Sequence, residues 1–118
     1  MPTTEQWLED NIIFTVWTAP LTSSQLSVCF SELVRQIQSK DAVVHVLFDI
    51  TKAGSIPAQA PMHFIRSQLA SQANLGSMAV IGTNAIGQIL AQTAIKMTGQ
   101  NILFFGDERE ALDYLRSS

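Results

Sequence analysis

The feature that most constrains the fold is the run 43–48, in which both alternating sets of side chains are apolar apart from His45. A strand of this kind is typical of a parallel sheet that is covered on both faces. Shorter apolar runs at 12–17, 78–81 and 102–105 alternate along the chain with segments of helical periodicity. Such alternation favours parallel strands joined by right-handed helical crossovers. The sequence therefore predicts an α/β fold.

The remaining segments complete the order ββαβαβαβα. Residues 5–8 and 12–17 predict an opening antiparallel hairpin, with Trp7 and Trp17 helping to pack it. Helices are predicted over 24–39, over 57–74, from the cap Thr83 or Asn84 to Gly99, and after the cap Asp107. We expect one domain, residues 1–118, built on a five-stranded, mixed and mostly parallel sheet with four helices.

Apolar spacing predicts which helical side chains are buried. Intervals of three and four residues define one face of each helix. In the first helix this face comprises Leu26, Cys29, Phe30, Leu33 and Ile37. In the second it comprises Met62, Ile65 and Leu69, and in the third Ile86, Ile89, Leu90, Thr93 and Met97. Cys29 is thereby interpreted as a small buried hydrophobe rather than a reactive thiol.

Composition and charge exclude several classes of protein. The chain is 47% hydrophobic and only 14% charged, which excludes disorder. Its net charge of −3 argues against a nucleic-acid surface. A single cysteine, with no signal peptide or transmembrane segment in the sequence, favours the cytoplasm. His45, His63 and Cys29 are too far apart for a metal-ligand pattern, so we expect neither metal nor cofactor.

Two segments at the carboxyl ends of predicted strands are candidate sites, because ligands of open α/β sheets gather there. The first is an interaction or regulatory loop formed by Asp49, Thr51, Lys52 and Ser55. Within it, Asp49 suits a turn in which its side chain bonds the backbone two residues on.

The second segment follows the strand 78–81. Its glycines, Gly82 and Gly87, are spaced as in a nucleotide phosphate loop, but Gln88 stands where that loop needs lysine. A nucleotide triphosphatase is therefore not expected. Thr83 and Asn84 stay as a candidate anion site at the start of the third helix.

The distribution of charge indicates a contact surface on the second and third helices. Between Asp49 and Asp107 there is no acidic residue, and the only basic residues are Lys52, Arg66 and Lys96. Exposed helix faces usually carry more charge, and an uncharged face is suited to being covered. We expect contact with a protein partner or a second copy, as in a homodimer. The candidate interface residues are Phe64, Gln68, Gln72, Gln88, Gln92 and Ile95.

The element order, the strand end at Asp49 and the closing pattern 105–115 (FGDEREALDYL) resemble the STAS fold family. This family includes anti-sigma-factor antagonists and a SpoIIAA-like branch. The resemblance implies a non-enzymatic regulatory or protein-interaction module. Phosphorylated antagonists begin their second helix with Asp-Ser-Ser-Gly, where this chain has Pro-Ala-Gln-Ala at 57–60. This difference from the antagonists implies a module without the usual serine phosphoswitch.

Two alternatives stay open. The SpoIIAA-like branch resembles lipid-carrying Sec14-type domains, which implies an apolar small-molecule or lipid ligand between the sheet and the second and third helices. The candidate pocket residues are Met62, Phe64, Ile86, Leu90 and Met97. The other alternative is an enzyme that uses His63 and Ser55, although the sequence places no activated nucleophile beside them. We expect no catalytic residues.

Overall fold

The computed structural model describes residues 3–82 and 84–118 and confirms the predicted order of elements. Five strands form one sheet in the order β1-β2-β3-β4-β5, with β1 antiparallel to β2 and every other pair parallel. The strands are β1 (Thr3–Glu9), β2 (Ile12–Thr18), β3 (Val44–Lys52), β4 (Leu75–Ile81) and β5 (Ile102–Phe105). The helices are α1 (Ser23–Gln38), α2 (Ala60–Arg66), the short 3₁₀ helix η1 (Leu69–Ser71), α3 (Ala85–Thr98) and α4 (Glu108–Arg116).

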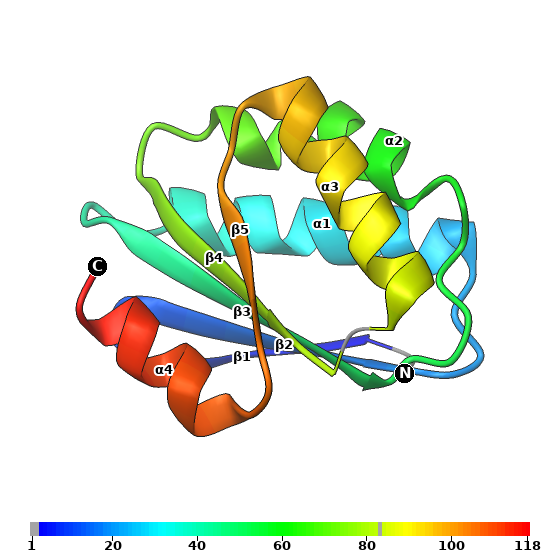
Figure 1. Cartoon of the computed structure of the whole chain (residues 1–118). Helices are drawn as coiled ribbons and strands as arrows, with labels where there is room; N and C mark the ends of the chain where they lie inside the picture. Colours follow the sequence, from blue (N-terminus) through cyan, green and yellow to red (C-terminus); the bar gives the residue numbers. More distant parts are fainter. Residues whose placement is uncertain (1–2, 83) are drawn as a thin grey trace.

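The sheet separates two apolar cores. Helices α1, α2 and α3 cover one face and α4 covers the other (Figure 1). Strand β3 contributes to both cores, because Val46 and Phe48 point to the three-helix side and Leu47 to the α4 side. This arrangement explains why the run 43–48 is apolar at both parities.

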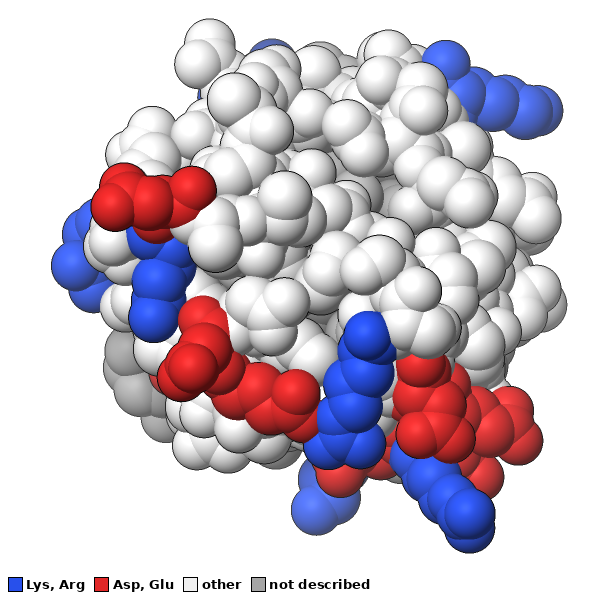
Figure 2. Space-filling view, turned by 90° about the vertical axis from the view of Figure 1, so that its left-hand side faces the viewer, with Lys and Arg blue, Asp and Glu red and all other residues white. Residues whose placement is uncertain are grey.

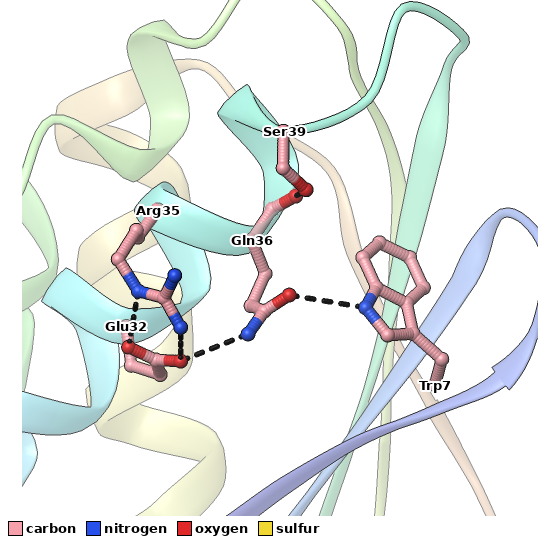
Figure 3. A network of polar contacts seen from close by, with 5 residues as sticks. All are labelled: Trp7, Glu32, Arg35, Gln36 and Ser39. Atoms are coloured by element: carbon pink, nitrogen blue, oxygen red, sulfur yellow. Dashed lines mark hydrogen bonds and ion pairs between the residues drawn. The ribbon is translucent and has the colours of Figure 1, made fainter.

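Helix α1 is fixed at both ends. Thr22 and Gln25 form a capping box at its start, in which each side chain bonds the other's backbone N–H. Near its end, Trp7 Nε1 of β1 donates to Gln36 Oε1, and Gln36 donates to Glu32 (Figure 3). Hydrogen bonds from Arg35 and then Gln36 lower the pKa of Glu32 to about 2. The network ties α1 to the edge strand.

The second predicted helix is shorter than expected. It ends at Arg66 instead of continuing to residue 74, and Gln68 adopts a left-handed conformation with φ of 63°. Ser67 Oγ donates to the Phe64 carbonyl and accepts from the Leu69 N–H, a local pattern that competes with helical bonding. The break lets Leu69 enter the core with no exposed surface. Met62, predicted to be buried, is exposed.

The buried face of α3 also differs from the prediction. Gly87 and Ala94 are buried, whereas Ile86, Ile89 and Met97 are exposed. The helix presents its small residues to the sheet. Its buried face is therefore shifted by about one residue from the face that we predicted from the large apolar side chains. Periodicity weighted by hydrophobicity misses a face made of glycine and alanine.

Candidate functional site

A cavity of about 80 Å³ lies between the sheet and helices α2 and α3. Its floor includes Phe48, Val80 and Phe104, which are paired neighbours on β3, β4 and β5. Its roof comes from α3, where the lining residues are Gly87, Leu90, Ala91 and Ala94. Because three of these four residues have little or no side chain, α3 leaves space above the sheet.

Aromatic rings form a rigid wall on the α1 and α2 side of this cavity. Trp17 packs edge-on against Phe30 and Phe48, with ring centroids 5.9 and 5.8 Å apart. Phe30 packs edge-on against Phe64 of α2 at 5.7 Å. Such edge-to-face pairs are favoured by ring electrostatics. The indole N–H of Trp17 already donates to Thr15 Oγ1 at 3.1 Å, so it is satisfied within the protein.

The cavity adjoins a surface hollow at the carboxyl ends of β3 and β4. The hollow is lined by Gly54, Ser55, Ile56, Asn84 and Ile86, and Ile56 also lines the cavity. Ser55 is exposed there. Of the two predicted caps, Thr83 or Asn84, the N-cap of α3 is Asn84, whose Oδ1 accepts from the Gly87 N–H at 2.8 Å. The apolar cavity therefore lies next to a hollow that contains the polar side chains of Ser55 and Asn84.

The four residues of the predicted interaction loop do not all lie in one loop. Strand β3 continues to Lys52, so Asp49 lies inside the strand rather than at its end. Asp49 Oδ1 accepts from the Thr51 N–H at 3.0 Å, as its turn interpretation predicted. Thr51 and Lys52 are exposed on the strand, and Ser55 lies in the hollow.

Of the five predicted pocket residues, Phe64 and Leu90 line the cavity. Ile86 lies at the hollow, and Met62 and Met97 are on the surface. The sequence missed the floor residues on β4 and β5 and the small residues of α3. In the anion-site prediction, Thr83 lies outside the described residues.

The predicted contact surface is exposed in part. Gln68, Gln88 and Gln92 are exposed and Gln72 is half-buried. Phe64 belongs to the core, and Ile95 is half-buried against it, so neither forms an open surface. Ile95 is covered because α3 buries the face that carries Gly87 and Ala94, and Phe64 is covered because α2 buries the face that carries Ala60 and Pro61.

The exposed sides of α2 and α3 also carry large apolar side chains that were predicted to be buried. Of seven large apolar side chains exposed in the described chain, four lie on α2 and α3. They are Met62, Ile86, Ile89 and Met97. Figure 2, which looks at the left-hand side of Figure 1, shows most of the charged side chains in the lower part of that face and a largely uncharged area above them.

His63 has a different partner from the one considered in the sequence. Its Nε2 forms a hydrogen bond with Ser23 Oγ at the start of α1, whereas Ser55 lies in the hollow. Ser23 and His63 are 40 residues apart, and no sequence motif links them. Neither side chain lines the cavity, so we interpret the pair as a tether between α1 and α2.

Within the described ranges, no three His, Cys, Asp or Glu side chains are grouped so that they could hold a metal ion. None of the helices in the same ranges has the length and hydropathy needed to cross a membrane.

Comparisons with known proteins support the fold. No model of a known protein family matches the sequence, and no curated protein matches it. A solved structure that matches is that of an uncharacterized protein from the DUF3478 family with a SpoIIAA-like fold, from Shewanella loihica PV-4. The match covers 96% of this chain and 91% of that chain, with 20% sequence identity and a TM-score of 0.66. The chain therefore has a SpoIIAA-like fold.

Proposed function

We propose that this protein is a non-enzymatic, cytoplasmic binding protein for a small apolar ligand. The observation that carries the proposal is the 80 Å³ cavity, whose lining side chains in the described chain include no charged group, hydroxyl or amide. Ligand sites are commonly apolar clefts with a few polar groups beside them, and the hollow at Ser55 supplies such a neighbour.

The energetics favour an occupant. The space is partly open at the protein surface, so its apolar lining meets solvent when no ligand is bound. Water is held poorly there, because a water molecule needs two to four polar partners and the described lining side chains offer none. An apolar ligand would recover the lost dispersion contacts.

Native mass spectrometry of freshly purified protein tests the proposal. We expect a mass excess that disappears on denaturation. Xenon added to the purified protein provides a second measurement, because apolar cavities accept it. We expect methyl NMR shifts at Leu90 and Val80, and none at exposed Val28 as the control. Absence of both the mass excess and the xenon shifts would overturn the proposal.

A second candidate function is a regulatory or protein-interaction module, as the resemblance to anti-sigma-factor antagonists implies. The exposed Met62 on α2 and the exposed Ile86, Ile89 and Met97 on the neighbouring α3 support it, because exposed apolar surface often marks interfaces. The segment 57–60 at the start of α2 carries no hydroxyl, so this candidate does not include the usual phosphoswitch. A charged substitution at Ile89, followed by a measurement of assembly, tests it.

A further inference from the structure

We propose that the cavity takes one compact aliphatic group, smaller than a benzene ring, and that the ligand's polar end lies in the hollow beside Ser55. This inference rests on the proposed function and specifies its ligand class. It predicts a short branched amphiphile, such as an alcohol or carboxylate that ends in an isopropyl or isobutyl group.

The size of the cavity sets the upper limit. An apolar cavity of about 150 Å³ binds benzene, and the space here is 80 Å³, roughly half as large. The aromatic wall restricts expansion on one side, because Trp17, Phe30 and Phe48 interlock edge to face. Beneath the cavity, Val80 lies on β4, which is hydrogen-bonded to a strand on each side. The space therefore cannot enclose a long acyl chain.

The lining sets the chemistry of the buried end. A polar atom placed there loses its hydration and gains no hydrogen bond, since the Trp17 N–H is already bonded to Thr15. The buried end must therefore be hydrocarbon. A branched group fills a compact space with more contacts than a linear group of the same carbon number.

The connection through Ile56 sets the position of the polar end. Ile56 lines both the cavity and the hollow, so the proposed ligand extends past this side chain toward the exposed Ser55 hydroxyl. The nearest charged residue in sequence is Lys52, and the chain has no acidic residue between Asp49 and Asp107. A neutral or negatively charged end is therefore favoured over a cationic one.

The test measures binding of a ligand series by calorimetry and methyl NMR. The series comprises isobutanol, isovalerate, hexanoate, decanoate and isobutylamine. We expect isobutanol and isovalerate to bind at least tenfold more tightly than decanoate, and isovalerate more tightly than isobutylamine. NMR shifts should appear at Leu90 and Ile56.

Ala91→Leu fills the cavity from α3, because Ala91 lines it. This variant should weaken isovalerate binding at least tenfold and raise the melting temperature. The matched control is Ala85→Leu, an exposed position on the same helix outside the lining; it should bind like wild type. If Ala91→Leu does not fold, Ile56→Phe obstructs the same path from the loop.

The outcomes separate the two levels of the proposal. If decanoate binds more tightly than isovalerate, the apolar-ligand function stands and the compact-group inference fails. Equal binding by wild type and Ala91→Leu would place the ligand elsewhere and also overturn the inference. If the purified protein shows no mass excess and neither xenon nor any member of the series binds, the proposed function itself fails.

Discussion

The Nδ1 atom of His45 accepts a hydrogen bond from the backbone N–H of Ser77, with 2.8 Å between the two nitrogens. This bond links the starts of β3 and β4 on the α4 side of the sheet. It requires a neutral imidazole with an unprotonated Nδ1. The side chain is only 4% exposed, and burial lowers the pKa of His45 below its ordinary value of 6.5.

The free energy of unfolding should therefore decrease as the pH falls below about 6.5. The unfolded chain takes up a proton on His45 before the folded chain does, so acid favours unfolding. In His45→Asn, the amide oxygen can replace the acceptor and does not titrate. Urea unfolding at about pH 7.5 and pH 5.5 should show a smaller loss in this variant than in wild type. Equal losses would contradict the assignment.

Gly76 of β4 is packed against the same histidine. A Cβ atom at this position would lie 2.7 Å from Val43 Cγ1 and 2.5 Å from His45 Cε1, and would also clash with His45 Nδ1. Gly76→Ala should therefore lower the free energy of unfolding by about 1–3 kcal/mol. Gly106→Ala is the control, because a Cβ there meets nothing within 4 Å. If both variants unfold at the same urea concentration, the close packing at Gly76 is wrong.

Cys29 should be unreactive in the folded protein. Cys29 is a residue of α1 whose side chain is fully buried, with its Sγ 3.5 Å from Thr15 Oγ1. This burial raises the pKa of the thiol to about 12. The nucleophilic thiolate is therefore scarce at about pH 8. A disulfide reagent should modify the thiol slowly in buffer and rapidly in denaturant. Rapid reaction of the native protein, at a rate above that of global unfolding, would contradict this burial.

The sequence was a good guide to those elements whose signals are local. The apolar run 43–48 predicted a strand covered on both faces, and Asp107 and Gly99 marked helix ends that the structure confirms. These signals depend on backbone geometry and burial within a few residues, so a single sequence contains them.

The cavity could not be predicted in the same way. It depends on the volume that Gly87, Ala91 and Ala94 leave above a sheet row on three strands, and hydrophobic periodicity does not measure volume. At the end of α2, the Ser67 hydroxyl bonds the Phe64 carbonyl and the Leu69 N–H, a pattern that hydrophobic periodicity does not register. The Ser23–His63 contact joins residues that only the tertiary fold brings together. Each of these features depends on packing or hydrogen bonds that apolar spacing does not encode.

The α2–α3 surface yields a last prediction, which concerns self-association. Ile89→Glu places a charge among the exposed apolar side chains of α3, whereas Val28→Glu does so on α1; both wild-type side chains are 61% exposed. Each change should alter the free energy of unfolding by less than about 0.5 kcal/mol.

If the surface binds a second copy, burying the carboxylate introduced by Ile89→Glu should weaken dimerisation at least about tenfold, or 1.4 kcal/mol. Sedimentation over a range of concentrations measures this, and the Gln92→Glu variant should act in the same direction. A wild-type protein that is monomeric throughout, or equal dimerisation of the Ile89 and Val28 variants, would show that this surface does not bind a second copy.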